Sequence, residues 1–383
     1  MVKKIALLGA TGSIGGSCFK VVAEQRDRLN ISLAAAHSNY SKLCPLALEF
    51  GIPTLVFTGI DDTSLHASIR REFPTLRIYF GKDSLNSLLL NEDYEIALNA
   101  IGGSNGIEAT FAVLSRGKDL ALANKESLVM GGHLVKKLQG NAKILPVDSE
   151  HSAIFQALGK HPLSEVEKLI ITASGGAFRR TPLSDFPAIT PQMALKHPNW
   201  DMGAKVTLDS ATMFNKALEV MEAHWLFDLP YERIDSIIHP QSIIHSMVQY
   251  VDGSILAQMS VPDMSLPILY ALSFPERWNS EIVQTDLYRL PELSFEPIAK
   301  ERYPLFHLGL EVARQGGILP TVMNAAVEAA MKLFLEQRIR FTDIPSLVYR
   351  TLSQTMQITD PDLKTILYTN ETSYQLTLGY VSH

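Results

Sequence analysis

Short apolar runs and longer amphipathic stretches alternate along the first 150 residues. The apolar runs are typical of strands that are buried on both faces. They fall at residues 5–8, 31–36, 54–57, 77–80, 95–101, 119–123 and 143–147. Helix-like stretches such as 17–24 and 106–116 separate them. Strands that alternate with helices in this way predict an α/β fold with a parallel, doubly wound sheet of Rossmann type.

The middle of the chain has a different pattern. Another apolar strand is predicted at 168–173, followed by a proline-containing stretch and then a helix over about 210–227. Two strand-like runs, 246–250 and 254–259, flank Asp252-Gly253, which is a strong hairpin signal. This region is therefore expected to form a second, mixed α/β layer.

The last third of the chain is helical in pattern. An irregular stretch over 274–300 precedes four helical segments, which are broken near Gly316-Gly317, Asp343 and Pro361. We therefore predict four parts: an N-terminal parallel-sheet domain of Rossmann type over 1–148, an α/β domain over 149–273, a linker over 274–300 and a C-terminal α-helical bundle over 301–383.

Composition and charge exclude several classes of protein. Of the 383 residues, 46% are hydrophobic and 19% are charged, which is ordinary for a globular protein. The net charge of -6 argues against a broad nucleic-acid surface, and it means that an anionic substrate needs a local cationic pocket. The two cysteines, Cys18 and Cys44, form no CxxC pair. With no apolar run long enough to span a bilayer, we expect a cytoplasmic protein without a membrane segment.

A glycine-rich segment lies between the first predicted strand and the first helix. It reads Gly9-Ala10-Thr11-Gly12-Ser13-Ile14-Gly15. Glycines there permit a tight turn and let a pyrophosphate approach the N–H groups at the helix N-terminus. The GxxGxxG spacing is also compatible with plain helix packing, but its place in the first strand-to-helix turn favours a dinucleotide site.

The residues after the second strand bear on which dinucleotide binds. An NAD site usually carries an acid here that holds the ribose 2′-hydroxyl. This sequence instead has His37, Ser38 and Asn39, with Lys42 nearby. The absence of a carboxylate favours NADPH, and Ser38 and Asn39 can donate hydrogen bonds to its 2′-phosphate. The alternative is that these are simply loop residues, which for His37 is the favoured interpretation.

Two further strands end in polar sequences, Asn124-Lys125-Glu126-Ser127 and Asp148-Ser149-Glu150-His151. Ligands of open α/β sheets bind outside the carboxyl ends of the strands. Asp148 and Glu150 leave an extended segment on the same side, and paired carboxylates suit a hard cation such as Mg²⁺ or Mn²⁺. A helix N-cap explains one of these acids but not both.

The predicted helix near residue 210 carries a second polar cluster. Asp209-Ser210-Ala211-Thr212 is interpreted as its start, and Asn215 and Glu219 share a face with Lys216 beside them. These side chains suit a phosphate and a metal, although from this helix alone a capped, solvated amphipathic helix is the favoured interpretation. Ser174-Gly175-Gly176 is a second candidate phosphate cradle, and by itself it is only a turn.

Taken together, these segments resemble one enzyme family, the 1-deoxy-D-xylulose 5-phosphate reductoisomerases. The motifs that carry the resemblance occur in the family's order: GATGSIG at 9–15, NKES at 124–127, PVDSEH at 146–151, ASGGAF at 173–178, HPNWDMG at 197–203, DSATMFNKALE at 209–219 and HPQSIIHSMV at 239–248. The resemblance implies reduction and rearrangement of a ketose phosphate to 2-C-methyl-D-erythritol 4-phosphate, the committed step of non-mevalonate isoprenoid synthesis. It also implies NADPH, a divalent cation (Mg²⁺, Mn²⁺ or Co²⁺) and a homodimer, in which the part over 1–148 is the cofactor domain and the part over 149–273 is the catalytic domain.

The resemblance assigns roles to residues by motif. The NADPH contacts are Thr11, Gly12, Ser13, Ile14, Asn124, Glu126 and Gly203, to which the strand-end argument adds Ser38 and Asn39. The metal ligands are Asp148, Glu150 and Glu219, which with Lys125 form the catalytic set. The substrate contacts are Lys125, Ser149, Glu150 and Glu219 at the reacting end and Ser174, His197, Ser210, Asn215 and Lys216 at the phosphate end. Trp200 and Met202 resemble part of a flexible lid.

The sequence departs from the family at His37-Ser38, where many members have a small residue followed by a basic one, and at Ala217, where glycine is common.

Two other functions remain open from the residues alone. A plain NADP-dependent dehydrogenase would not need three carboxylates, and a non-catalytic NADP sensor would not need a substrate-phosphate site. The residues do not rank the divalent metals, and they do not separate retroaldol cleavage from direct α-ketol migration.

Overall fold

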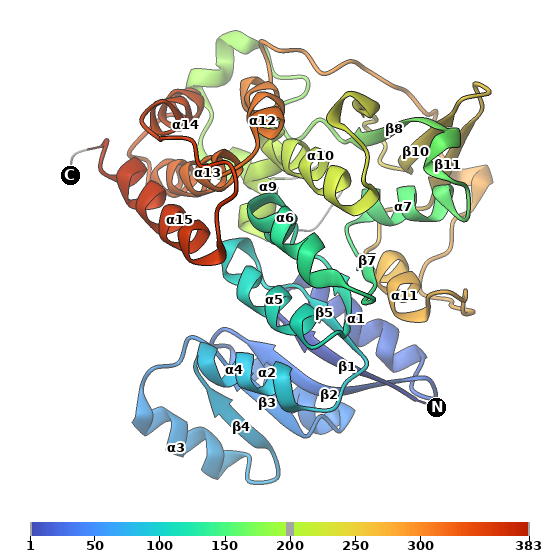
Figure 1. Ribbon diagram of the computed structural model, residues 1–383, viewed down its shortest axis with the longest axis vertical. Coiled ribbons are helices and arrows are strands. Elements are labelled where there is room, and N and C mark those ends of the chain that lie inside the picture. Colours follow the sequence, from blue (N-terminus) through green and yellow to red (C-terminus); the bar gives the residue numbers. More distant parts are fainter. Residues whose placement is uncertain (1, 197–202, 382–383) are drawn as a thin grey trace. The chain divides into compact units, whose positions relative to one another are not determined.

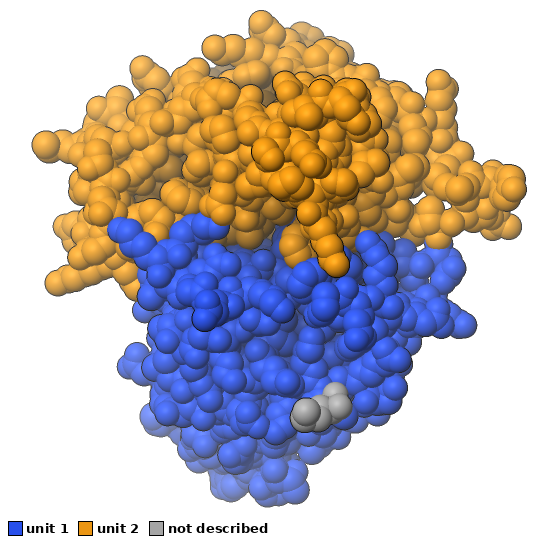
Figure 2. Space-filling model, turned by 45° about the vertical axis from the view of Figure 1, so that its right-hand side comes forward, with its two compact units in different colours: residues 1–127, 135–152, 263–284 blue, residues 128–134, 153–262, 285–383 orange. Residues whose placement is uncertain are grey.

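The computed structural model describes residues 2–196 and 203–381. By contacts, the chain divides into two compact units (Figure 2). Unit 1 comprises Met1–Ser127, Val135–Ser152 and Asp263–Gln284, and unit 2 comprises Leu128–Leu134, Ala153–Pro262 and Thr285–His383. The predicted catalytic and helical parts thus fall largely together in unit 2. The domain boundaries at 148, 273 and 300 stay a prediction.

Unit 1 is built on a seven-stranded, fully parallel sheet in the order β4-β3-β2-β1-β5-β6-β7 (Figure 1). The strands are β1 (Lys3–Leu8), β2 (Leu29–Ala36), β3 (Thr54–Phe57), β4 (Arg77–Phe80), β5 (Ile96–Asn99), β6 (Asp119–Leu122) and β7 (Ile144–Pro146). The doubly wound parallel sheet predicted from the sequence is confirmed. Strand order reverses between β1 and β5, and ligands of such sheets bind at this switch point.

Helices cover both faces of this sheet because right-handed crossovers change face where the strand order reverses. They are α1 (Ser13–Glu24), α2 (Tyr40–Phe50), α3 (Thr63–Glu72), α4 (Lys82–Asn91), α5 (Ile107–Ser115), α6 (Glu126–Gln139) and α11 (Ser265–Ser273). Helix α1 packs beside α11, and α4 packs beside α5 on the opposite face (Figure 1). The chain passes from unit 1 into unit 2 within α6 and again within α7 (Ser149–Leu158).

The segment after α11 also belongs to unit 1 as far as residue 284. It was predicted as an irregular linker, and between 274 and 300 it contains no α-helix. Its first part is nevertheless tied to the sheet domain, because Gln25 Nε2 donates to the carbonyl of Asn279 at 2.8 Å and the N–H of Glu281 donates to Glu24 at 2.7 Å. Its last part extends a sheet edge in unit 2, where the N–H of Glu296 donates to the carbonyl of Ile238.

Unit 2 combines a four-stranded sheet with a layer of helices. The sheet order is β11-β10-β8-β9, with β8 (Val166–Ala173), β9 (Ile234–Ile238), β10 (Ile244–Tyr250) and β11 (Ile255–Met259). Strands β10 and β11 are antiparallel, which confirms the predicted hairpin. The helices are α8 (Pro191–Ala194), α9 (Ala204–Ala211), α10 (Phe214–Phe227), α12 (Pro304–Gln315), α13 (Leu319–Leu335), α14 (Ile344–Ser353) and α15 (Leu363–Leu378).

One apolar core joins the sheet of unit 2 to its helices. It runs from Val166 and Leu169 of β8 through Phe214 of α10 to Phe334 of α13 and Val348 of α14. Helix α13 is buried along most of its length and packs against α14 and α15. The four C-terminal segments predicted from the sequence are confirmed as α12 to α15. Within the described part of the chain, no helix has both the length and the apolar character that crossing a bilayer requires.

One predicted helix is wrong in its bounds. The sequence suggested a single helix over 210–227, but α9 ends at Ala211 and α10 begins at Phe214. Between them Met213 has a left-handed backbone (φ 60°), and the Oγ1 of Thr212 accepts the N–H of Phe214 at 3.3 Å. Asp209–Thr212 is therefore the end of one helix rather than the start of another. A threonine side chain that competes for a backbone N–H is a local reason for the break.

Candidate active site

The glycine-rich turn lies at the switch point of the unit 1 sheet, between β1 and α1. Gly9 has a φ of +80°, and a Cβ atom there would lie 2.3 Å from the carbonyl oxygen of Ala100. A Cβ atom on Gly15 would lie 2.3 Å from the carbonyl oxygen of Ala10. Both glycines are therefore required by close backbone packing. Gly12 is the N-cap of α1 and has no side chain, so the first N–H groups of the helix remain exposed to a bound anion.

A cavity of about 360 Å³ adjoins this turn within unit 1. Its wall comes from the end of β2, from the residues that follow β1, β2, β3 and β5, and from the N-terminal parts of α4 and α5. The lining residues are Gly9, Thr11, Gly12, Ala35, Ala36, His37, Thr58, Lys82, Leu85, Asn86, Ala100, Ile101, Gly102, Asn105, Glu108 and Ala109. The structure thus brings Thr11 and Gly12 of the predicted cofactor residues to a cavity, and Ser13 and Ile14 open the helix beside it.

Ser38 and Asn39 follow β2 but are absent from the cavity wall, whereas His37 lines it. Asn39 is the N-cap of α2, and its Oδ1 accepts the N–H of Lys42 at 3.1 Å. The Nζ of Lys42 donates to the carbonyl of Thr11 at 2.9 Å, which links α2 to the glycine-rich turn. Asn39 therefore has a structural role of its own. Its contact with a 2′-phosphate, like that of Ser38, stays a prediction.

The Asn-Lys-Glu loop follows β6 and is tied to the loop after β5. Asn124 is buried, and its Nδ2 lies 2.7 Å from the carbonyl of Ile101, 2.8 Å from that of Gly103 and 3.0 Å from Glu126 Oε2. Its Oδ1 accepts the N–H of Ser127 at 3.2 Å. Asn124 thus fixes two strand-end loops against each other and orients the carboxylate of Glu126.

A lysine and two carboxylates meet at the ends of β6 and β7. Lys125 forms an ion pair with Asp148, and their side chains are 11% and 14% exposed. Glu150 lies in the first turn of α7, where the Oγ of Ser149 donates to its Oε2 at 2.6 Å. Carboxylate oxygens of Asp148 and Glu150 lie within 4.8 Å of each other. The two carboxylates are hard oxygen donors that suit Mg²⁺ or Mn²⁺, and the Lys125 ammonium lies beside them.

The local geometry of this pair differs from the prediction. An extended segment was expected at Asp148 and Glu150, but α7 already begins at Ser149. The two carboxylates therefore approach because the chain turns from strand to helix between them, and not because they alternate along a strand. The carbonyl of Asp148 accepts the N–H of Ser152, as the residue before a helix does.

A second charged cluster lies on α10 in unit 2. Lys216 donates to one carboxylate oxygen of Glu219 and Asn215 donates to the other. The Lys216 and Glu219 side chains are 5% and 1% exposed. The predicted shared face of Asn215 and Glu219 is confirmed, and the alternative of a solvated helix is wrong because the charged side chains are buried. Desolvating two charges costs free energy that offsets their attraction, so this buried pair by itself is weak evidence for a stabilising role.

The Ser174-Gly175-Gly176 turn follows β8 and packs against the end of α9. Gly175 and Gly176 have φ values of +84° and +68°, and a Cβ atom on Gly176 would lie 2.4 Å from the carbonyl oxygen of Ser210. The Oγ of Ser174 accepts the N–H of Gly176 at 3.2 Å. The turn and Ser210 are therefore neighbours, although they are far apart in sequence. Gly203 is the N-cap of α9. His197, Trp200 and Met202 lie outside the described residues.

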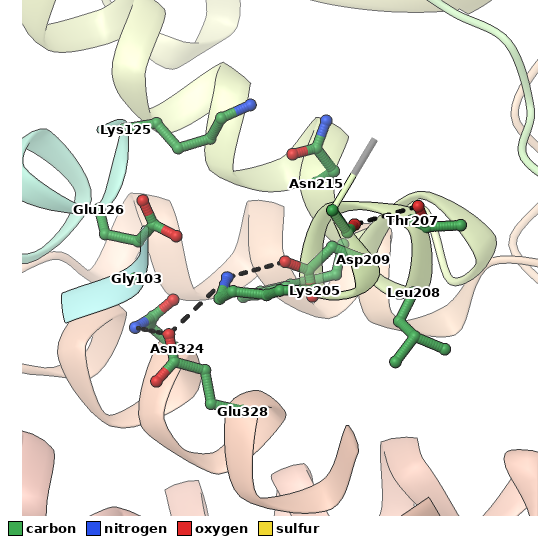
Figure 3. A network of polar contacts seen from close by, with 12 residues as sticks. Gly103, Lys125, Glu126, Lys205, Thr207, Leu208, Asp209, Asn215, Asn324 and Glu328 are labelled. Carbon is green, nitrogen blue, oxygen red and sulfur yellow. Dashed lines mark hydrogen bonds and ion pairs between the residues drawn. The ribbon is translucent and has the colours of Figure 1, made fainter. Parts of the chain in front are cut away.

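Sequence reasoning missed a polar network in unit 2 (Figure 3). The Nζ of Lys205 lies 2.8 Å from Asp209 Oδ2 and 3.7 Å from Glu328 Oε1, and Asn324 Nδ2 lies 3.4 Å from the same Glu328 oxygen. The network fastens α9 to α13. The four-residue spacing of Lys205 and Asp209 is a helical ion-pair signal. Nothing in the sequence links them to Glu328.

Comparison with known proteins identifies the chain. A family model described as 1-deoxy-D-xylulose 5-phosphate reductoisomerase matches residues 5–132, and models of that enzyme's C-terminal domains match residues 144–227 and 259–375. The reductoisomerase of Lysinibacillus sphaericus is 43% identical over 383 residues, covering 99% of this chain and 100% of its own. That of Prosthecochloris aestuarii is 43% identical, covering 98% and 100%.

The chain belongs to the 1-deoxy-D-xylulose 5-phosphate reductoisomerase family.

Solved structures of reductoisomerases agree with the fold. The enzyme from Zymomonas mobilis in complex with NADPH matches with a TM-score of 0.92 at 37% identity, and all of both chains is covered. A reductoisomerase in complex with NADPH, fosmidomycin and magnesium matches with a TM-score of 0.91 at 35% identity, covering 99% of this chain and 98% of the other. The family and fold predicted from the sequence motifs are thus confirmed over the whole chain.

Proposed function

We propose that this chain catalyses the NADPH-dependent rearrangement and reduction of 1-deoxy-D-xylulose 5-phosphate to 2-C-methyl-D-erythritol 4-phosphate. The observation that carries the proposal is the Lys125, Asp148 and Glu150 cluster at the carboxyl ends of β6 and β7. The glycine-rich turn follows β1 of the same parallel sheet. A plain dehydrogenase has no need of a carboxylate pair at this edge, whereas a metal-assisted rearrangement does.

The cofactor fits the residues at the switch point. The turn requires glycine at positions 9 and 15, and the N–H groups of the first turn of α1 suit a pyrophosphate. Thr11, Gly12, Ser13 and Ile14 are the proposed pyrophosphate contacts, with Asn124, Glu126 and Gly203 toward the nicotinamide half. Solved relatives contain NADPH, which supports this assignment.

A divalent cation fits the carboxylates. We assign Asp148 and Glu150 of unit 1 and Glu219 of unit 2 as its ligands, because carboxylate oxygens are the donors that Mg²⁺ and Mn²⁺ prefer. Magnesium in solved relatives supports the choice. When bound, NADPH supplies a hydride and the cation supplies a Lewis acid for vicinal substrate oxygens.

The chain's own residues provide the remaining chemistry. The Nζ of Lys125 can carry a proton to or from a substrate hydroxyl, and its charge stabilises a developing alkoxide. Ser149 and Glu150 bind the same end of the sugar. Ser174, His197, Ser210, Asn215 and Lys216 hold the phosphate, so that its binding energy orients the reacting carbons. The family resemblance that implies these roles also implies a homodimer and a cytoplasmic location, and we include these two properties in the proposal.

The test is NADPH oxidation by the purified protein with the ketose phosphate, with and without Mg²⁺ or Mn²⁺, and with the product identified by mass spectrometry. We expect turnover only with metal, and a product with the branched carbon skeleton. The Asp148→Asn variant is the matched control for the metal site. Failure to oxidise NADPH with any of Mg²⁺, Mn²⁺ and Co²⁺ would overturn the proposal. An unbranched product would show that the protein is a plain dehydrogenase that does not catalyse the rearrangement.

A further inference from the structure

The 2′-phosphate of NADPH carries up to two negative charges, so a protein that selects NADPH over NADH generally places a cation beside it. The residues after β2 do not supply one. The segment reads His37-Ser38-Asn39, and Asn39 caps α2 with its Oδ1. The next basic residue, Lys42, is held on the carbonyl of Thr11 and is not part of the cavity wall.

A lysine from elsewhere in unit 1 does line the cavity. Among its described lining residues, Lys82 is the one lysine or arginine. It follows β4 and opens α4, so it comes from the same edge of the sheet as His37 after β2 and Thr58 after β3. The carboxyl ends of these parallel strands face one side, which is why side chains distant in sequence share one cavity.

The contact of Lys82 leaves its charge available. Its Nζ lies 3.1 Å from Asn105 Oδ1, a neutral amide oxygen in the loop after β5. No carboxylate of the described residues forms an ion pair with it within 4.0 Å, and the acid in the cavity wall, Glu108, acts against an anionic ligand. Lys82 is therefore the group that can make the cavity accept a phosphate. It also reaches across from α4 to the opposite wall at Asn105.

We propose that Lys82 binds the 2′-phosphate of NADPH and sets the preference of this chain for NADPH over NADH. The inference rests on the proposed function only in taking NADPH as the cofactor. It goes beyond that function because it moves the cationic part of the 2′-phosphate site from the end of β2 to the start of α4. Lys82 is mostly solvent-exposed, so its contribution is moderate rather than large.

The experiment measures the dissociation constants of NADPH and NADH, by quenching of protein fluorescence or by calorimetry, for the full chain and three variants. Lys82→Gln removes the charge, Lys82→Arg keeps it, and Lys20→Gln removes one charge from an exposed position on α1 outside the cavity. We expect Lys82→Gln to weaken NADPH binding by about tenfold while NADH changes less than about twofold. Lys82→Arg and Lys20→Gln should remain near the parent.

Three results would overturn the inference. If Lys82→Gln weakens NADPH and NADH equally, Lys82 contacts the part that both cofactors share. If it weakens neither, or if Lys20→Gln has the same effect, the 2′-phosphate is held elsewhere. These binding measurements need no substrate, so they are independent of the turnover assay. A parent protein that binds NADPH well but does not convert the ketose phosphate contradicts the proposed function and leaves the role of Lys82 standing.

Discussion

Substitution of Lys216 by alanine tests both the stability and the chemistry of the cluster on α10. The ion pair of Lys216 with Glu219 is almost fully buried, with side-chain exposures of 5% and 1%. Alanine at 216 leaves the Glu219 carboxylate buried without its cation. Removing one partner of such a pair typically destabilises a protein by about 3–5 kcal/mol, because the remaining charge is uncompensated. Asn215 still donates a hydrogen bond to Glu219 in this variant, so we expect the lower end of this range, about 3 kcal/mol.

The catalytic effect adds to the structural one. If Lys216 holds the substrate phosphate, its loss should reduce transition-state binding by about 2–5 kcal/mol. The loss should appear in both KM and kcat, since a displaced sugar also reacts more slowly. NADPH affinity should barely change, because Lys216 is assigned to the substrate. The double variant Lys216→Ala/Glu219→Gln removes both charges and should recover about 2 kcal/mol of the lost stability while remaining inactive.

The assay combines urea unfolding with steady-state kinetics and NADPH binding. Lys332→Ala is the control, because Lys332 is an exposed lysine on α13 of the same unit. It should leave the unfolding midpoint, KM and kcat unchanged. The reasoning is refuted if Lys216→Ala has the unfolding midpoint and the KM of the parent. If only NADPH binding weakens in this variant, our division between substrate and cofactor residues is wrong.

Four further predictions follow from the same structure. Glu219→Gln should lose activity by at least about 100-fold even at saturating NADPH, because a metal ligand is lost. Its circular dichroism should be native, but its urea midpoint should be lowered because the ion pair with Lys216 is lost. Near-native turnover would show that Glu219 is not a metal ligand. The parent should prefer NADPH to NADH, and Ser38→Asp should erode that preference by repelling the 2′-phosphate; equal catalytic efficiency of the parent with both cofactors would contradict this. Mg²⁺ should raise the melting temperature of the parent but not of Asp148→Asn, because a ligand that binds only the folded state stabilises it; an equal rise in both would place the cation elsewhere. Burial lowers the pKa of His239 from its ordinary value of 6.5, and its ring accepts the N–H groups of Ile243 and Ile244. Folding therefore favours the neutral form of His239, so the contribution of this ring to the free energy of unfolding is complete above about pH 6.5 and is lost as the pH falls toward the lowered pKa. His239→Gln should flatten the difference in urea midpoint between pH 7.5 and pH 5.5, which lie about one unit to either side of that value. An unchanged pH dependence would refute the assignment.

The pH prediction gives a structural role to a motif that the sequence left without one. HPQSIIHSMV was recognised at 239–248 only as part of the resemblance. In the structure the His239 ring is buried, its Nδ1 lies 2.9 Å from the carbonyl of Ser294, and its Nε2 receives two backbone N–H groups. The ring therefore joins the start of β10 to the segment before α12. It does so as the neutral tautomer with the proton on Nδ1.

The sequence by itself determined the sheet of unit 1 and the identity of most candidate residues. Strands β3 and β4 have the predicted bounds, Thr54–Phe57 and Arg77–Phe80. Short runs of apolar residues between polar or glycine-containing turns are a local signal of burial, and this signal needs no knowledge of the rest of the chain. The glycine-rich turn and the polar ends of β6 and β7 were likewise found because a parallel sheet gathers its strand ends at one edge.

The tertiary structure decided how those residues are paired. The break at Thr212–Met213, the start of α7 at Ser149, and the burial of Lys216 with Glu219 depend on hydrogen bonds and packing that periodicity does not encode. The same holds for contacts between distant segments, such as Lys205 with Glu328 and Lys82 with Asn105. A lysine on a helix has the same local pattern whether it faces solvent or a buried carboxylate, because its environment is supplied by other elements. Only the folded chain distinguishes these cases.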